Sequence, residues 1–173
     1  MSQDNAPALE FTVRESVMLG RNPHLGMFSA PGAADEAAVD EALEAMELTP
    51  LADRPANRLS GGERQRAMLA AVLAQQSECL LLDEPTSALD VRHTLKLVGH
   101  LRNLRERCGI LMVTHDLDLA LRYADRVVLL KEGRVVSAGA PDETMSEENL
   151  ASAYGCKAAT LRNEKFKTVV FYR

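Results

Sequence analysis

The alternation of apolar runs and helical patterns in the second half of the chain constrains its fold most strongly. Three short apolar runs are separated by two helical patterns, in the order 79–82, 91–107, 110–114, 117–124 and 126–131. Strands that alternate with helices in this way are typical of a parallel α/β sheet. The first and second runs are continuously apolar, which predicts strands buried on both faces of the sheet.

The chain before residue 76 contains helical patterns and loops but no convincing strand. Apolar residues recur at helical spacing within 35–47, and a second helix is expected from about 61 to 76. The ambiguous segment 11–19 could open a further helix capped at Thr12, with Glu15 closing a capping box.

The C-terminal part is predicted to mix strands and a helix. A strand at 134–138 follows the third apolar run across Glu132-Gly133, which favours a hairpin turn. A helical pattern then covers 142–154, and 166–172 could form a last strand.

Length and composition indicate a single domain. The chain has 173 residues and is 46% hydrophobic, which is enough for a sizeable core. We expect one partial α/β domain over 1–173, with a helical subdomain at about 12–75 and the remainder of the core at about 76–173.

Charge and apolar patterning exclude some classes of partner. A net charge of −5 and an aromatic content of only 4% disfavour nucleic-acid binding. No apolar run approaches the roughly 20 residues of a membrane span, and the N-terminus lacks signal-peptide features. The expectation is a soluble chain, or one that docks on a membrane through a partner.

Cys79, Cys108 and Cys156 suit a reducing compartment and are expected to be small buried hydrophobes.

Two carboxylates end the first predicted strand. Asp83 would lie at the carboxyl edge of a parallel sheet, where ligands bind, and could hold Mg²⁺. Glu84 reaches a different point and could act on a water that attacks a phosphate. His115 ends the next strand, so it is expected at the same edge, near a phosphate oxygen. A helix N-cap pair remains the structural alternative for Asp83 and Glu84, whereas His24, His93 and His100 are expected at the surface.

The run Leu59–Gln65 predicts a phosphate-binding helix start. Ser60 with Glu63 forms a capping box, and Gly61-Gly62 would let an anion approach the unpaired N–H groups. A good cap and an anion site use the same geometry, so the two interpretations do not compete.

These residues together resemble the nucleotide-binding subunits of ATP-binding-cassette (ABC) transporters. Leu59–Gln65 resembles the signature motif of that family, and Leu80–Glu84 its Walker B strand with the catalytic glutamate. Ser87–Asp90 resembles the D-loop, His115 the switch histidine, and Gln3 the Q-loop glutamine.

The resemblance implies that two such subunits sandwich two ATP molecules head to tail. Ser60, Gly61, Gly62 and Gln65 would then serve the ATP of a partner subunit, and Asp90 would couple the two sites. Closing the sandwich would drive a membrane permease.

The same resemblance assigns the chain's own half-site, with ATP and Mg²⁺ as cofactors. Asp83 and Gln3 would hold the metal, and Glu84, His115 and Gln3 would be catalytic. Its permease would be integral to the membrane and served by a substrate-binding protein, with no nucleic acid involved. The chain would lie on the cytoplasmic face of the bacterial plasma membrane.

A subfamily resemblance is carried by Phe11–Val17 followed by Gly20–Gly26. These segments resemble the ATPases of importers for iron-siderophores, haem and cobalamin.

One family motif is missing from these residues. A Walker A loop has the pattern G-x-x-x-x-G-K-[ST], but no Gly in the sequence is followed by Lys. We therefore expect an N-terminally truncated chain that neither binds ATP tightly nor hydrolyses it alone, with exposed apolar surface on its strands. The alternative is a binding module that dimerises with an intact ATPase subunit. A chromosome-maintenance or DNA-repair ATPase is disfavoured, because no long coiled coil separates Gln3 from Ser60.

Overall fold

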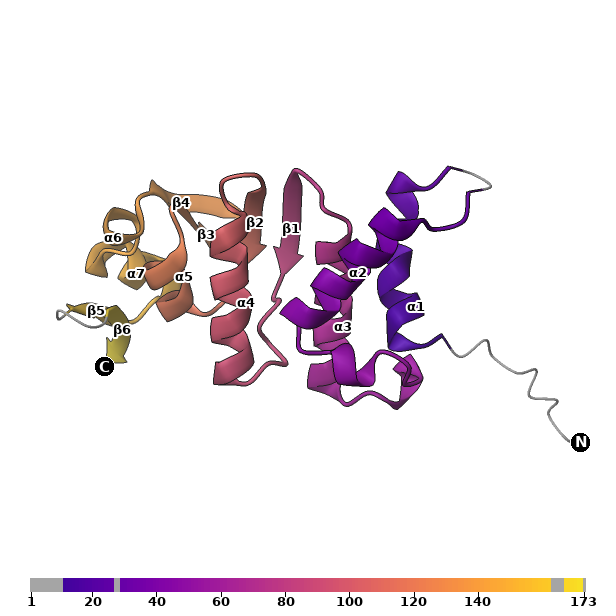
Figure 1. Cartoon of the computed structure of the whole chain (residues 1–173). Helices are drawn as coiled ribbons and strands as arrows, with labels where there is room; N and C mark the ends of the chain where they lie inside the picture. The colour runs from indigo at the N-terminus through magenta and orange to yellow at the C-terminus, as the bar shows by residue number, and fades with distance from the viewer. Residues whose placement is uncertain (1–10, 27–28, 163–166, 173) are drawn as a thin grey trace, which may run out of the picture. The chain divides into compact units, whose positions relative to one another are not determined.

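A computed structural model describes residues 11–26, 29–162 and 167–172 of the chain (Figure 1). The chain divides into two compact units, Met1–Val113 and Thr114–Arg173. Each unit has its own cluster of buried apolar side chains. The predicted division at about residue 75 stays a prediction.

The first unit is mainly helical and carries one pair of strands in its described part. Its elements are α1 (Val13–Met18), η1 (Leu19–His24), α2 (Ala33–Ala45), η2 (Thr49–Leu51), η3 (Ala56–Arg58), α3 (Gly61–Ala74), β1 (Cys79–Asp83), α4 (Val91–Leu104) and β2 (Gly109–Val113). The helices predicted within 35–47, 61–76 and 91–107 are thus confirmed. So is the helix capped at Thr12, with Glu15 completing its capping box.

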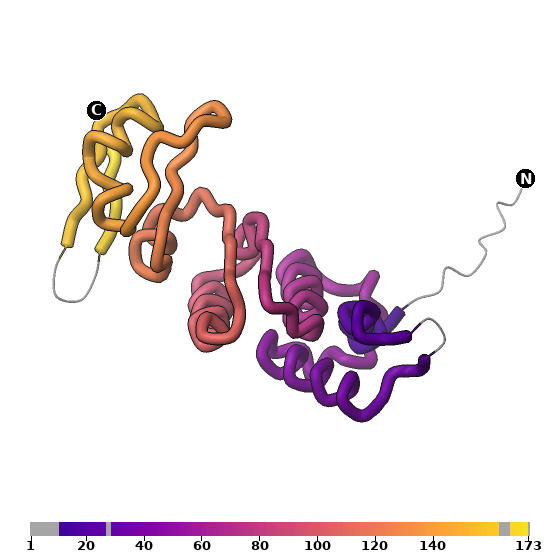
Figure 2. The backbone as a smooth tube through the Cα atoms, turned by 90° about the horizontal axis from the view of Figure 1, so that it is seen from above, coloured from indigo at the N-terminus to yellow at the C-terminus, as the bar shows by residue number. Residues whose placement is uncertain are grey.

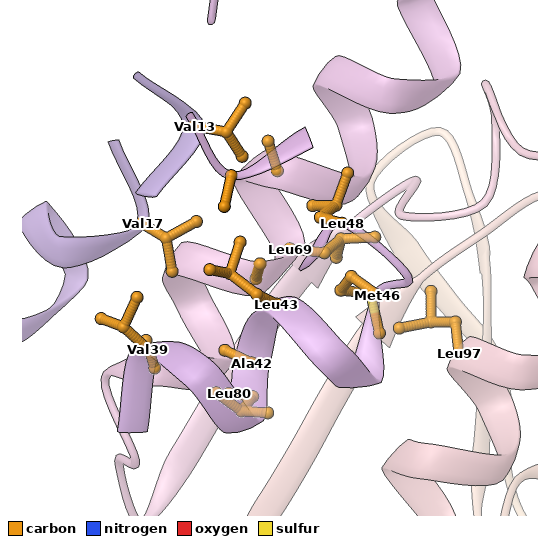
Figure 3. Close-up of a cluster of buried hydrophobic side chains, with 14 of the residues drawn as sticks. Val13, Val17, Val39, Ala42, Leu43, Met46, Leu48, Leu69, Leu80 and Leu97 are labelled. Carbon is orange, nitrogen blue, oxygen red and sulfur yellow. The ribbon is translucent and has the colours of Figure 1, made fainter. Parts of the chain in front are cut away.

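The core of this unit lies where α1, α2 and α3 pack together. Figure 3 shows the side chains of Val13 and Val17 from α1 in one buried cluster with Val39 and Leu43 from α2. These four residues have no exposed surface. Burying one such side chain contributes roughly 1.5–3 kcal/mol, so the apolar faces of the helices hold the subdomain together.

The strands β1 and β2 pair in parallel, with Cys79 opposite Gly109 and Asp83 opposite Val113. Only one face of the pair is buried, because successive side chains of a strand point to opposite faces. Leu80 and Leu82 belong to the core, whereas Leu81 is 72% exposed. The prediction that both strands are buried on both faces is therefore wrong. The expected exposed apolar surface is confirmed by Leu81, Leu111 and Val113.

The segment η1 is fixed against α3 by a close approach and a buried ion pair. A Cβ at Gly20 would lie 2.1 Å from the carbonyl oxygen of Ala71, so no side chain fits there. The next residue, Arg21, is buried and donates from Nε to Asp35 Oδ1 at 2.9 Å. Its Nη1 donates to the carbonyl of Ala74 at 2.7 Å. Arg21 thereby ties η1 to α2 and to the end of α3.

The second unit combines two hairpins with three helices in its described part. Its elements are α5 (Leu117–Tyr123), β3 (Val127–Lys131), β4 (Arg134–Gly139), α6 (Pro141–Thr144), α7 (Glu147–Tyr154), β5 (Lys157–Arg162) and β6 (Lys167–Tyr172). Figure 2 shows the paired strands β5 and β6 in yellow. The helix at 117–124 and the last strand at 166–172 are confirmed.

The predicted turn at Glu132-Gly133 is confirmed by positive φ angles of 49° and 74° at the two residues. The antiparallel pairing of β3 with β4 confirms the predicted hairpin, and the parallel pairing found in the described residues is that of β1 with β2. Two details of this unit differ from the prediction. The expected helix at 142–154 is two helices, because Ser146 caps a new one. The strand β5 was not predicted.

Two remaining expectations concern cysteines and membranes. Cys108 is buried as expected, but Cys79 and Cys156 are exposed. Cys79 points away from the core because of the strand alternation in β1. Among the residues that the structure describes, no helix is both long and apolar enough to cross a membrane.

Candidate functional site

The start of α3 is built by a reciprocal pair of hydrogen bonds. The Glu63 N–H donates to Ser60 Oγ at 3.4 Å, and the Ser60 N–H donates to Glu63 Oε2 at 2.8 Å. This confirms the predicted capping box. The bond from the Ser60 backbone stabilises the charged carboxylate, so the pKa of Glu63 lies below its ordinary value.

The next two N–H groups of α3, those of Gly61 and Gly62, have no acceptor among the described residues. Gly61 is exposed, and a Cβ there would meet no atom within 4 Å. Packing within the described chain therefore does not require glycine at this position. A helix start with open N–H groups and room around it can accept an anion, because its partial charge is positive.

The two carboxylates predicted at the sheet edge lie at the end of β1. Asp83 is its last residue and is exposed. The Glu84 N–H donates to the Val113 carbonyl at 2.9 Å, which extends the pairing of β1 with β2 by one residue. Glu84 has a φ of 45° and opens a turn, in which its carbonyl accepts from Ser87 Oγ at 3.0 Å. An exposed carboxylate such as Asp83 fits Mg²⁺ as one oxygen ligand.

The segment that follows Glu84 packs against the first turns of α3. A Cβ at Gly62 would lie 3.1 Å from the carbonyl oxygen of Ala88, so the two backbones are in close approach. Gln65 Nε2 donates to the Pro85 carbonyl at 3.3 Å. The structure thus brings Gly62 to the Ser87–Asp90 run that resembles a D-loop, and Gln65 to the turn that precedes it.

Asp90 ends this segment as the N-cap of α4. Its Oδ1 accepts the His93 N–H at 2.9 Å and lies 2.8 Å from His93 Nδ1. The backbone N–H of His93 is the main cause that lowers the pKa of Asp90. His93 Nε2 lies 3.1 Å from Arg66 Nη1 on α3. The side chain of His93 is only 20% exposed, so the prediction of a surface histidine is wrong.

Glu47, just after α2, borders this cluster. It forms ion pairs with Arg92 and Lys96 of α4, and its Oε2 lies 3.4 Å from His93 Nε2. The hydrogen bond from Lys96 is the main cause that lowers the pKa of Glu47. The ends of α2, α3 and α4 are therefore linked by charged groups.

Two predicted site residues are not joined to this arrangement by the structure. His115 is exposed and lies in the second unit, so its predicted approach to Asp83 and Glu84 stays a prediction. Gln3 lies outside the described residues. No group of three or more His, Cys, Asp or Glu side chains in the described part of the chain could hold a metal ion by itself.

The comparison with protein families decides the class of protein. The family described as ABC transporter matches residues 1–87, which include the capping box of α3 and the two carboxylates Asp83 and Glu84 at the end of β1. The chain belongs to the ABC transporter family. Its α/β fold is the ABC ATPase fold, as the solved structures also show.

Relatives of the chain include ATP-binding proteins of import and transport systems. The chain is 41% identical over 159 residues to the ferric enterobactin transport ATP-binding protein FepC of Escherichia coli, covering 91% of this chain and 59% of FepC. It is 42% identical over 160 residues to the cobalamin import ATP-binding protein BtuD of Halobacterium salinarum, covering 91% of this chain and 39% of BtuD. The chain thus spans about two fifths to three fifths of the length of these relatives.

A solved structure is similar over nearly the whole chain. It is an inward-facing conformation of a putative metal-chelate type ABC transporter, with a TM-score of 0.81 and 27% identity. The match covers 99% of this chain and 68% of that chain.

Arg66 and His93 were not found by sequence reasoning. The signal available for His93 was its spacing, since it stands three residues after the N-cap Asp90, where a capped helix turns a side chain back to its cap. Its second contact, with Arg66, joins residues 27 positions apart. No local pattern indicates a contact of that separation.

Proposed function

We propose that this chain acts as the ATP-binding subunit of an ABC importer for iron chelates, haem or cobalamin. The resemblance of its N-terminal segments and the names of its relatives support this substrate class. The permease, a second ATP-binding subunit and a substrate-binding protein would be its partners. It would work at the cytoplasmic face of the membrane.

The start of α3 would serve ATP held by the partner subunit. Ser60, Gly61 and Gly62 present a hydroxyl, two open N–H groups and the positive end of a helix, which together suit a γ-phosphate. Gln65 would hold this helix start on the turn after β1 through its bond to Pro85. The N–H groups of Gly61 and Gly62, which have no acceptor among the described residues, and the open space around Gly61 are the observations that carry the proposal.

The edge of β1 would serve the chain's own nucleotide. Asp83 would ligate Mg²⁺ with Gln3, Glu84 would act as base toward the attacking water, and His115 would contact the γ-phosphate. Bound Mg²⁺–ATP would supply the phosphoanhydride bond that is hydrolysed. Asp90 would couple the two half-sites, since its segment contacts α3.

The proposal is tested by ATP-dependent association of the chain with an intact importer ATPase subunit that carries a phosphate loop. The intact subunit carries Gln in place of its catalytic Glu, so that ATP is not consumed, and its own ATP-dependent dimerisation is the positive control. Gly61→Asp places a carboxylate at the phosphate position, and Gly61→Asn is the matched neutral control.

We expect association with ATP but not with ADP. Gly61→Asp should weaken it about 100-fold or more, because the carboxylate and the phosphate carry like charges in a desolvated site. Gly61→Asn should weaken it far less. Association that is equal with ATP and ADP, or insensitive to Gly61→Asp, would contradict the proposed role of α3.

The proposed catalytic role of Glu84 is tested separately by ATPase activity. Hydrolysis that disappears in Glu84→Gln would support it, and hydrolysis that is unchanged in this variant would contradict it.

A further inference from the structure

The segment between Glu84 and α4 is held on α3 at three points. The first two are the close approach of Gly62 to the Ala88 carbonyl and the bond from Gln65 to the Pro85 carbonyl. The third runs from Arg66 through His93 to Asp90. Gly62, Gln65 and Arg66 all lie within the first two turns of α3, so they form one contact line along it.

The third point defines the state of the histidine ring. A guanidinium has N–H donors and no acceptor, so the 3.1 Å contact of Arg66 Nη1 requires a lone pair on His93 Nε2. The proton of a neutral ring must then be on Nδ1, where it faces Asp90 Oδ1 at 2.8 Å. Arg66 Nη1 also donates to the Met46 carbonyl at 3.1 Å, so both of its hydrogens have acceptors.

A protonated ring would not preserve this arrangement. With hydrogens on both nitrogens, Nε2 would turn from an acceptor to a donor and would face Arg66 with like charge. The acceptor available to an Nε2–H group would be Glu47 Oε2, at 3.4 Å. The charge of Glu47 is already compensated by its ion pairs with Arg92 and Lys96. The hydrogen bond from Arg66 Nη1 therefore fits a ring that carries its hydrogen on Nδ1 and a lone pair on Nε2.

We propose that His93 is a positioning residue, which in its neutral Nδ1–H form bridges Arg66 to Asp90 and so locks the 85–90 segment onto α3. The start of α3 and the carboxylates that end β1 then move as one body within the subunit. This role rests on the proposed function, because the positioned groups are the two nucleotide half-sites. A ring with 20% exposure, set between two elements, is well placed for such a bridge.

The tautomer is tested on the full 173-residue chain by nitrogen-15 NMR of its histidine rings. We expect His93 to show a protonated Nδ1 and an unprotonated Nε2 at pH 7, assigned by the loss of its signals in His93→Asn. An Nε2–H tautomer or an imidazolium at that pH overturns the proposal. This readout needs no nucleotide and no partner, so it is independent of the proposed function.

The lock is tested by hydrogen exchange of two N–H groups within the segment. The Ser87 N–H donates to the Glu84 carbonyl at 3.2 Å, and the Leu89 N–H donates to the Thr86 carbonyl at 3.0 Å. His93→Asn keeps a donor near Asp90 but has no atom at the Nε2 position. If the bridge is worth about 1 kcal/mol, exchange of both groups rises roughly fivefold to tenfold.

Two further variants separate positioning from general stability. His93→Gln places an amide oxygen where Arg66 can donate to it, so slow exchange should partly return. Arg102→Gln changes an exposed residue on the same helix, away from Glu47 and the bridge, and should leave exchange unchanged. Equal acceleration in Arg102→Gln and His93→Asn, at equal global stability, overturns the lock.

The functional consequence is measured last, by ATP-dependent association with the intact subunit. We expect His93→Asn to weaken it about tenfold and His93→Gln to restore it in part. Unaltered association in His93→Asn overturns the positioning role. Failure of the unsubstituted chain to associate overturns the proposed function instead, whereas the tautomer and exchange results would still stand.

Discussion

The chain contains the same capping box at the starts of two helices, but their N–H groups are used differently. In α1, the N–H groups of Val13 and Arg14 donate to the carbonyls of Arg54 and Ala52 at 3.0 and 2.9 Å. In α3, the corresponding groups of Gly61 and Gly62 have no acceptor in the described part of the chain. One helix start is closed by a distant loop, and the other is open.

The burial of the first helical residue also differs between the two starts. Val13 follows its cap directly and has no exposed surface, whereas Gly61 at the same position is exposed and uncrowded. A capping box therefore defines where a helix begins, but it does not show that an anion binds there. The surroundings of the first N–H groups decide between a structural cap and a binding site.

The largest expected difference comes from one substitution made at both starts. Val13→Asp buries an unpaired carboxylate in the core of the first unit and should lower the free energy of unfolding by roughly 3–5 kcal/mol. Gly61→Asp places the same group in solvent at the positive end of α3 and should change stability by less than about 1 kcal/mol. Urea titrations followed by circular dichroism measure both; equal losses would remove the distinction between closed and open starts.

A glycine pair sharpens the comparison further. Gly20→Ala forces a Cβ against the Ala71 backbone and should destabilise the chain by about 1–3 kcal/mol. Gly61→Ala meets no atom and should be neutral or slightly stabilising, by a few tenths of a kcal/mol. Thermal unfolding of the two variants is the measurement. A substantial loss in Gly61→Ala would mean that the open space at that position is occupied.

The caps themselves should be nearly equivalent. Thr12→Ala and Ser60→Ala each remove the side chain that accepts from the third residue of the helix, at a cost of about 1 kcal/mol. Chemical denaturation should give similar losses for both, although Ser60→Ala alone should also weaken ATP-dependent association. Loss of association in Thr12→Ala at unchanged stability would argue against the assignment of the open start as the nucleotide contact.

The smallest expected effect is a pH dependence that both boxes share. Bonds from the Thr12 and Ser60 N–H groups lower the pKa of Glu15 and Glu63 below the ordinary value of 4.5. A carboxylate whose pKa is lowered by folding stabilises the folded state at pH values above its ordinary pKa. This contribution disappears as the pH falls through the pKa of the folded state. Stability measured from pH 6 down to pH 3 should therefore fall less in Glu15→Gln and Glu63→Gln than in the unsubstituted chain.

Local sequence patterns predicted much of the secondary structure. Both capping boxes, the two helices that they begin and the Glu132-Gly133 turn depend on residues a few positions apart. The signature run and the carboxylates after β1 also sufficed to identify the family before any geometry was known. The placement of Asp83 at the end of a strand was predicted from the apolar run before it.

Other features could not be predicted because they depend on residues far apart in sequence. Leu81 belongs to a continuous apolar run, yet its exposure is decided by which face of the β1–β2 pair meets the core. The charged Arg21 can be buried because Asp35, the Ala74 carbonyl and the side-chain amide oxygen of Gln76 accept its hydrogen bonds. His93 was expected at the surface, since nothing nearby in sequence predicts its contact with Arg66.

The sequence by itself determined the helix starts, the strand ends and the family, because capping, turn formation and strand periodicity are short-range interactions. Only the tertiary structure decided that the start of α1 is closed by the 52–56 loop and that of α3 is open. It also decided that Gly62, Gln65 and Arg66 hold the segment after Glu84. The physical reason is that hydrogen-bond satisfaction and burial depend on what the folded chain brings close, and not on the order of its residues.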